Sequence, residues 1–414
     1  MIDAIKKEIG EKIGRKIKTR GDCELVSIAI LETLDIEISY STIRRFFGLV
    51  PNTKPNKKTL NILTQFIGYK DFIHFSQNYQ YKEKINLSHI IYETVAEGNE
   101  EKIVSLVKET KNSPENFIGF IVILLRELLH TENYVLINRL FELEALSFNN
   151  FSYSEALYLG NSVGLLLRDK PKLDTKLLNN INFLECVYST FVDYSNLNKY
   201  YGDWSEIIKR NKREKEITIF STAILELRNF LNNNPVNKLD VDFIYNKQTH
   251  PILKSRLLAL KLLSKNSNNN LEILNDYFNM HTKSGAAIDY AYELFTTTIL
   301  TKNVQIMSYL IENISWNLKF YYQKSHLNSY FLMCLFYYKL TGNPEKEKEY
   351  IKLFRLRECQ HSYKEFINLI YLIYLFSIPA KSSEKNKIKN IYLTLSKKLS
   401  YPYFSEEFLL NYFK

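Results

Sequence analysis

The feature that most constrains the fold of this 414-residue chain is the recurrence of apolar, helix-length segments in its C-terminal part. Four such segments begin at residues 251, 289, 328 and 364, at spacings of 38, 39 and 36 residues. Each is followed by a polar hinge and a second helical segment. A period of this length with two helices per unit is typical of stacked helical hairpins, because a hairpin buries its apolar face only against its neighbours. The spacing therefore predicts an α-solenoid in the C-terminal part.

Strand signals are scarce throughout the chain. Alternating apolar and polar runs are few, and hairpin dipeptides such as Asn-Gly and Asp-Gly do not occur. The 12 Gly and 9 Pro lie mostly between helix-length segments, and the 45% hydrophobic content is sufficient for a buried core. We therefore expect an all-α protein.

The first 80 residues contain shorter helical segments, predicted at residues 2–17, 22–34, 39–49 and 57–69. Suitable capping residues precede or open three of them, namely Asp22, Ser39 and Thr59. The predicted organisation is a helical bundle over residues 1–80 and a helical-repeat domain over residues 84–414. A subdivision of the second domain near residues 200–250 is left open.

Positive charge is concentrated in the predicted N-terminal bundle. The chain has a net charge of +10, and residues 1–84 contribute +5 of it, from 15 Lys and Arg against 10 Asp and Glu. No acidic residue occurs from Ile38 to Lys70, a window that holds five closely spaced cations: Arg44, Arg45, Lys54, Lys57 and Lys58. Lys rises together with Ile, Asn, Tyr and Phe, as in AT-rich coding DNA, so the position of the charge is more informative than its total.

The third predicted helix has two distinct faces. On a helix, Ile43, Phe46 and Phe47 fall on one side, whereas Tyr40, Ser41, Arg44 and Arg45 fall largely on the other. A helix that enters the DNA major groove needs such an apolar side toward its own domain, and arginines that contact guanine. The basic loop that follows runs into another helix N-terminus, which is a common place for phosphate contacts.

The stretch "ISYSTIRRFFG...KPNKKTLNILTQFIGY" resembles the lambda-repressor-like helix-turn-helix pattern, and "GYKDFIHF" is similar to N-terminal domains of Bacteroidetes-type regulators. The resemblance covers about residues 1–75. It implies that Ser39 caps the recognition helix and that Tyr40, Ser41 and Arg44 contact base edges. It also implies that Thr42 and Arg45 contact the DNA backbone or the bases. The residues implied to contact phosphates are Lys54, Lys57, Lys58 and Thr59.

The chain departs from this family pattern in two places. The usual Thr-Gln-x-x-Leu start of the second helix is replaced by "TRGDCEL", which removes one expected phosphate clamp, and "LDIEIS" makes a longer turn than usual. In the C-terminal part, "GNPEKEKEYIKLF" is similar to the start of a tetratricopeptide second helix, with Pro344 at the first helical position. The resemblance there is to tetratricopeptide-like repeats.

Motifs for catalysis, metal binding or membrane insertion are not found. The seven His and four Cys are dispersed, and no phosphate loop, HExxH, CxxC or GxSxG pattern occurs. The apolar runs 117–125 and 366–376 are shorter than the ~20 residues of a spanning helix. We expect a cytoplasmic protein that is not an enzyme, with no cofactor, no metal and no membrane partner.

These patterns favour a transcription regulator. We expect the N-terminal bundle to bind double-stranded DNA and the repeat domain to sense a peptide or protein, or to form a homodimer. A two-fold dimer would bind half-sites about one helical turn, ~34 Å, apart or a multiple of it. The alternative is a helical-repeat interaction scaffold, in which the basic face of the bundle is solvated and does not bind DNA.

Overall fold

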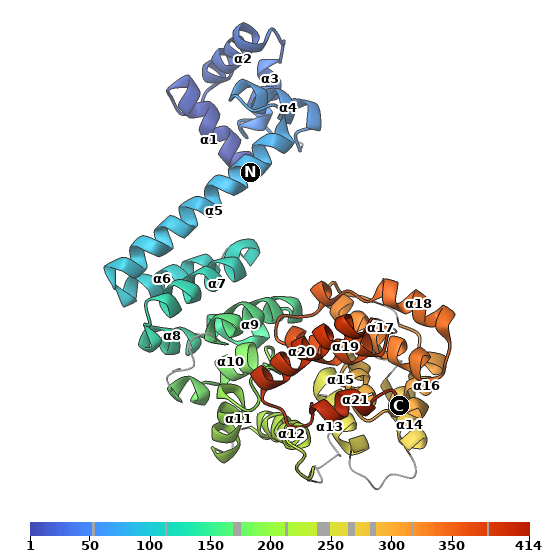
Figure 1. The fold of residues 1–414 in the computed structure, drawn as a ribbon. Helices are drawn as coiled ribbons and strands as arrows, with labels where there is room; N and C mark the ends of the chain where they lie inside the picture. Colours follow the sequence, from blue (N-terminus) through green and yellow to red (C-terminus); the bar gives the residue numbers. More distant parts are fainter. Residues whose placement is uncertain are drawn as a thin grey trace. The chain divides into compact units, whose positions relative to one another are not determined.

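The computed structural model describes residues 1–51, 54–111, 114–168, 175–211, 214–237, 249–263, 270–281, 287–316, 318–378 and 381–414, with the backbone only at 80–86 and 114–116. Every regular element within these ranges is a helix, and none is a strand (Figure 1). The predicted all-α class is confirmed. No helix among the described residues has both the length and the apolar character needed to cross a membrane.

The chain divides into two compact units, Met1–Asn99 and Glu100–Lys414, named here the N-terminal unit and the C-terminal unit. The helices of the N-terminal unit are α1 (Ile2–Ile13), α2 (Arg20–Leu34), α3 (Tyr40–Phe46), α4 (Lys57–Phe66) and α5 (Phe72–Glu97). The sequence placed a domain boundary at residues 80–84, but α5 is continuous there. It contains no Gly or Pro, and it ends where Gly98 adopts a left-handed φ of 66°.

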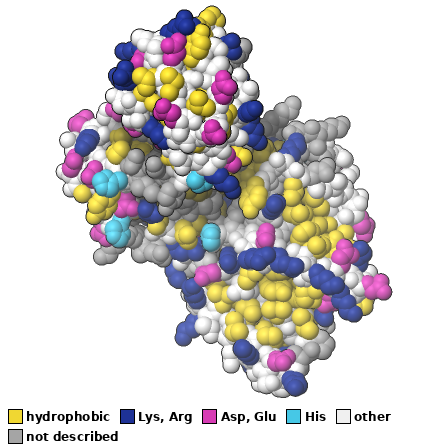
Figure 2. Space-filling model, turned by 90° about the horizontal axis from the view of Figure 1, so that it is seen from above, with side chains coloured by type: hydrophobic (Ala, Val, Ile, Leu, Met, Phe, Trp, Pro, Cys, Tyr) yellow, Lys and Arg dark blue, Asp and Glu magenta, His cyan; other side chains and the backbone are white. Residues whose placement is uncertain are grey.

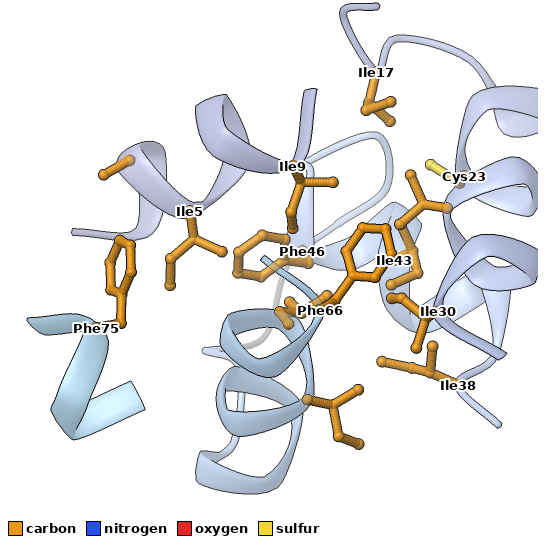
Figure 3. Packing of buried hydrophobic residues seen from close by; sticks show 14 residues of the cluster. Ile5, Ile9, Ile17, Cys23, Ile30, Ile38, Ile43, Phe46, Phe66 and Phe75 are labelled. Atoms are coloured by element: carbon orange, nitrogen blue, oxygen red, sulfur yellow. The ribbon is translucent and has the colours of Figure 1, made fainter. Parts of the chain in front are cut away.

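The core of the N-terminal unit is built from apolar side chains of all its helices. Helix α2 packs on α3 and α4, and α4 also packs on α1 and α5. Figure 3 shows how the side chains converge, with contributions from Ile5, Ile9, Ile17, Cys23, Ile30, Ile38, Ile43, Phe46, Phe66 and Phe75. Burying each large aliphatic or aromatic side chain of this kind stabilises the fold by about 1.5–3 kcal/mol.

Some helix ends differ from the predictions. Helix α1 stops at Ile13 because Gly14 adopts a left-handed φ of 78°, so the buried Ile17 belongs to the following loop. Helix α2 is capped by Thr19 and not by Asp22, which is the third helical residue of a capping box. Helix α4 is capped by Asn56, so the predicted cap at Thr59 is wrong. The predicted cap of α3, Ser39, is confirmed.

The C-terminal unit contains the remaining helices. The first group is α6 (Glu100–Lys111), α7 (Pro114–His130), α8 (Tyr134–Phe141), α9 (Tyr153–Arg168), α10 (Ile181–Phe183), a π-helical turn (Leu184–Tyr188), α11 (Tyr200–Arg210) and α12 (Lys215–Leu231). The second group is α13 (Pro251–Leu263), α14 (Asn270–His281), α15 (Ala287–Leu300), α16 (Val304–Asn313), α17 (Gln323–Leu340), α18 (Pro344–Leu353), α19 (Lys364–Ser377), α20 (Ser382–Leu399) and α21 (Glu406–Asn411). Short 3-10 turns lie between some of them.

The eight helices predicted from the repeat spacing are all present, as α13 to α20 (Figure 1). The first helices of successive predicted units lie against one another, since α13 packs on α15 and α15 packs on α17. Within a unit, α17 packs on α18 and α19 packs on α20. Asn303 and Asn343 cap the second helices α16 and α18 through side-chain oxygens, which explains where these two hinges end.

Candidate nucleic-acid interface

Helix α3 is held to the N-terminal unit by one side and exposes the other. Ile43 and Phe46 are buried against the core. At about 100° per helical residue, Ser41 and Arg45 lie roughly opposite Ile43. In the structure Arg45 is exposed and Ser41 is half-buried. The geometry that the sequence predicted for α3 is therefore present at these positions.

A cluster of hydroxyl groups stands at the start of α3. The Oγ of Ser39 accepts the backbone N–H of Thr42 at 3.3 Å, which is the capping bond of the helix. The same oxygen lies 3.0 Å from the Oγ of Ser41 and 2.9 Å from the Oγ1 of Thr42. Small polar groups that donate and accept hydrogen bonds are thus gathered at the first turn, where base edges and phosphates are contacted in groove-binding helices.

The aromatic ring of Tyr40 is exposed but has a neighbour on α2. The guanidinium carbon of Arg20 lies 5.0 Å from the centre of the ring, and Arg20 also donates to Glu24 Oε1 at 2.8 Å. A cation–π contact of this kind at an exposed site contributes about 0.5–1 kcal/mol. Tyr40 is therefore positioned by α2 while keeping 36% of its surface accessible.

The two adjacent arginines of α3 differ in exposure. Arg44 is half-buried, and its Nε is buried without a hydrogen-bond partner among the described residues. Burial raises the pKa of the Cys23 thiol on α2, and the positive charge of Arg44 opposes that rise, which indicates that the guanidinium lies near α2. Arg44 follows the buried Ile43 by only about 100° around the helix, so its stem is drawn toward the domain. Of the two arginines, Arg45 is the more accessible.

The loop after α3 and the first turn of α4 supply the remaining predicted contacts. Lys54, Lys57 and Lys58 are exposed. Thr59 is only 9% exposed, and its N–H donates to Asn56 Oδ1 at 2.8 Å. The predicted phosphate contact at Thr59 is therefore the least accessible of the set, because the helix is capped at Asn56 and Thr59 lies inside its first turn.

The cations of the N-terminal unit fall into two groups. Four of the seven cations of α1, α2 and the loop between them form ion pairs with carboxylates nearby in sequence, and Lys12, Lys16 and Lys18 form none among the described residues: Lys6 pairs with Asp3, Lys7 with Glu11, Arg15 with Asp22, and Arg20 with Glu24. By contrast, within the described part of the chain, none of the five cations between Arg44 and Lys58 forms an ion pair. Their charge is not neutralised locally.

The structure also shows features that the sequence interpretation missed. Leu25, Ile28 and Leu31 form a stripe on the outer side of α2 and are 41%, 56% and 46% exposed. The space-filling view shows apolar side chains at the surface beside basic and acidic ones (Figure 2). The spacing of three residues between these positions was the available signal, but α2 is apolar on more than one side, so the buried face could not be distinguished from the exposed one.

A second missed feature is a cavity in the C-terminal unit, in which a buried arginine and several carboxylates line one space. Groups of three or more His, Cys, Asp or Glu side chains that could hold a metal ion do not occur among the described residues.

Comparison of the chain with models of protein families, with curated proteins and with solved structures finds no match in any of the three.

Proposed function

We propose that this protein is a DNA-binding transcription regulator. The N-terminal unit would act as a helix-turn-helix domain, with α2 as the supporting helix and α3 as the helix that enters the major groove. Arg45 and the hydroxyl groups at the start of α3 face the bases, and Lys54, Lys57 and Lys58 contact phosphates. Arg44, whose stem is half-buried, reaches the duplex only with its terminal nitrogens.

The observation that carries the proposal is the contrast in charge pairing. Four of the seven cations of α1, α2 and the loop between them have carboxylate partners, whereas none of the five from Arg44 to Lys58 has an ion pair among the described residues. Unpaired cations beside a helix that offers hydroxyl groups suit a polyanion, because binding releases the counterions of its phosphates. The first turn of α4, which Asn56 caps, contains no acidic residue, and this favours a phosphate there.

The C-terminal unit would serve as the sensor or dimerisation domain. The packing of α13 on α15 and of α15 on α17 supports a tetratricopeptide-like solenoid of helical hairpins, in which each unit contacts its neighbours. Such arrays present extended surfaces to a peptide or protein. A homodimer formed through this unit would place two copies of α3 on successive half-sites.

Fluorescence anisotropy of the full chain with a labelled random-sequence duplex tests the proposal. We expect binding at low salt and a logarithm of the association constant that falls linearly with the logarithm of the salt concentration, by roughly 0.9 per phosphate contact. Absence of binding at low salt, or an association constant that does not respond to salt, contradicts it. Exchanging both Arg44 and Arg45 for Ala should remove sequence preference while far-UV circular dichroism stays unchanged.

The exposed stripe on α2 favours a second function, that of a protein-interaction scaffold. Leu25, Ile28 and Leu31 are accessible apolar side chains on one face, as expected for a helix that meets another protein. If the stripe rather than the basic segment is the functional surface, the full chain shows no salt-dependent DNA binding, and Ile28→Asp abolishes association with the partner protein. If DNA binding is the function, the same variant leaves the salt response unchanged.

A further inference from the structure

A cavity of about 400 Å³ lies within the C-terminal unit. It is lined by side chains from α9, the π-helical turn and the segment after it, α12, α13, α15 and the residues before α19. Its volume is in the range of small-molecule sites, which is about 300–1,000 Å³. The cavity is therefore large enough for a ligand of several non-hydrogen atoms, and its walls show which chemistry that ligand has.

One wall is formed by a buried arginine, some of whose N–H groups have no hydrogen-bond partner among the described residues. Arg256 on α13 is 2% exposed, and its Nη2 donates to Glu293 Oε1 and to the hydroxyl oxygen of Tyr194, both at 2.8 Å. Its Nε and Nη1 are buried and have no hydrogen-bond partner among the described residues. A buried donor without an acceptor costs about 1–3 kcal/mol, so a molecule that supplies acceptor oxygens is stabilised here.

The charge of this wall is already balanced by Glu293, which pairs with Arg256. The Oγ1 of Thr249, which also lines the cavity, is a further buried polar atom without a partner among the described residues. This wall therefore supplies hydrogen-bonding groups but no uncompensated positive charge. A carboxylate or a carbonyl oxygen can use them, and the guanidinium donates strong charge-assisted bonds to either.

Three glutamates bring negative charge to the exposed part of the cavity lining. Glu214 and Glu216 are exposed and Glu185 is half-buried, and all three line the cavity. Burial raises the pKa of Glu185, and the charges of Glu214 and Glu216 raise it further. Like charges that repel one another in this way are relieved by a cation. Glu216 also accepts the backbone N–H of His250 at 3.2 Å, which orients that carboxylate.

Glu185 occupies a specialised piece of backbone. It lies in the π-helical turn Leu184–Tyr188, where the N–H of Ser189 donates to the carbonyl oxygen of Leu184 at 2.8 Å, five residues back. Single π turns are frequent at functional sites. The lining also includes apolar and aromatic side chains: Tyr153, Leu157, Ile217, Phe220 and Leu253.

We propose that this cavity binds a small zwitterion of the amino-acid or short-peptide class. The ammonium group lies among Glu185, Glu214 and Glu216, the carboxylate or terminal carbonyl accepts from Arg256, and an apolar side chain fills the space between. This proposal depends only on the cavity, so its test does not require that the N-terminal unit binds DNA. Within the proposed regulator it assigns the ligand that the C-terminal unit senses.

Isothermal titration of the full chain with three probes tests the inference: L-leucine, L-phenylalanine and the dipeptide leucyl-phenylalanine. We expect at least one of them to bind at millimolar concentration or below. Its N-acetylated form, which lacks the ammonium group, and its amide, which lacks the carboxylate, should each bind at least about tenfold more weakly, as for loss of a hydrogen bond to a charged group. Binding of none of the three overturns the inference.

Variants at the two ends assign the contacts. Arg256→Lys keeps the charge beside Glu293 but loses Nε and Nη1, and should weaken the bound probe at least about tenfold. Should this variant fail to fold, Glu185→Gln with Glu214→Gln should remove the preference for the free ammonium over the N-acetylated probe. Glu345→Gln, at an exposed position of α18, is the matched control. Binding that is equal in the wild type and in the double glutamate variant contradicts the placement of the ligand.

Discussion

The two units of this protein place their charged groups in opposite ways. The core of the N-terminal unit is apolar, and the cations of that unit lie outside it. The C-terminal unit instead buries charged pairs, such as Arg256 with Glu293 and Arg168 with Asp193, whose carboxylate is 0% exposed. Charge at a surface attracts a large polyanion from solution, whereas charge inside a fold selects a small molecule by shape and hydrogen bonds.

The buried pairs also show how the C-terminal unit is held together. Asp193 accepts from Arg168 Nε and Nη2 at 2.9 Å each, and from the hydroxyl of Tyr200 at 2.6 Å. Arg168 further donates to the carbonyl oxygen of His361 at 3.3 Å, far along the chain. Because Arg168 and Asp193 neutralise each other, removal of either side chain leaves the other charge buried and unpaired. The N-terminal unit contains no equivalent among its described core residues.

The largest expected effect concerns the surface charge. Exchange of Arg45, Lys54, Lys57 and Lys58 for Ala should lower DNA affinity by about three to four orders of magnitude at 0.1 M salt. Each of the three lysine contacts to phosphate contributes roughly 0.9 of a decade there, and loss of the Arg45 contact to a base adds about one decade. The dependence of the association constant on salt should weaken by three phosphate contacts, and thermal unfolding should not change. Anisotropy measures both quantities.

A matched variant localises that effect. Exchange of four exposed cations of α1 and the following loop, Lys7, Arg15, Lys16 and Lys18, removes the same charge from the same unit. The expected loss of affinity is much smaller, because these residues lie outside the proposed interface. Equal losses in the two variants would show that DNA binding, if present, follows net charge and not α3 and α4.

The buried charge should have its main effect on stability. Glu293→Ala leaves Arg256 without a counter-charge and should lower the unfolding free energy of the C-terminal unit by about 3–5 kcal/mol. Urea unfolding followed by circular dichroism measures this. Glu345→Ala, at an exposed position, should change it by less than about 0.5 kcal/mol. A small effect of Glu293→Ala would mean that the interior of the C-terminal unit tolerates unpaired charge.

A smaller effect is expected from pH. Burial lowers the pKa of His250 to about 4, with His326 and Arg256 lowering it and Asp289 opposing them. The unfolded chain binds a proton near pH 6.5 that the folded chain does not bind until about pH 4. Stability is therefore fully present above pH ~6.5 and falls by about 2–3 kcal/mol as the pH drops toward 4. In His250→Asn this part of the pH dependence should be absent, which is measured as the difference between the two unfolding profiles.

The smallest effect is expected at the start of α3. Ser39→Ala removes the capping oxygen and should lower the stability of the N-terminal unit by about 1 kcal/mol. Ser39→Asp keeps an acceptor and should restore the stability, but it places a negative charge at the proposed DNA interface. Recovery of stability together with reduced DNA affinity in Ser39→Asp would separate the two roles of this position; recovery of both would contradict a DNA contact there.

The sequence predicted the helices better than their assembly. Repeat spacing located α13 to α20 because each amphipathic helix carries its own periodicity. Prediction from periodicity failed at two helix ends of the N-terminal unit. At Gly14 the apolar stripe continues past a residue with a left-handed backbone, and at Thr19 the capping box is formed with the residue three positions later, Asp22. Such ends depend on single residues that periodicity does not weigh.

The candidate sites were predictable to different degrees. The basic segment is local in sequence, so Arg45 and Lys54 could be found from charge alone, but the half-burial of Arg44 depends on the approach of α2. The cavity could not be predicted, because Tyr194, Arg256 and Glu293 come together only through packing between distant segments. Arg256 and Glu293 lie among other polar residues of α13 and α15, such as Lys254 and Asp289, so no local pattern singled them out.

The π-helical turn has a consequence for recognising related chains. A turn of this type accommodates one residue more than an α-helical turn does, so loss of a single codon from the stretch encoding Leu184–Tyr188 would let the segment relax to ordinary helix. Glu185 would then rotate away from its present direction, and Ser189 would shift with it. On the proposed ligand site, a homologue without this extra residue is expected to keep the fold and to bind the ligand more weakly.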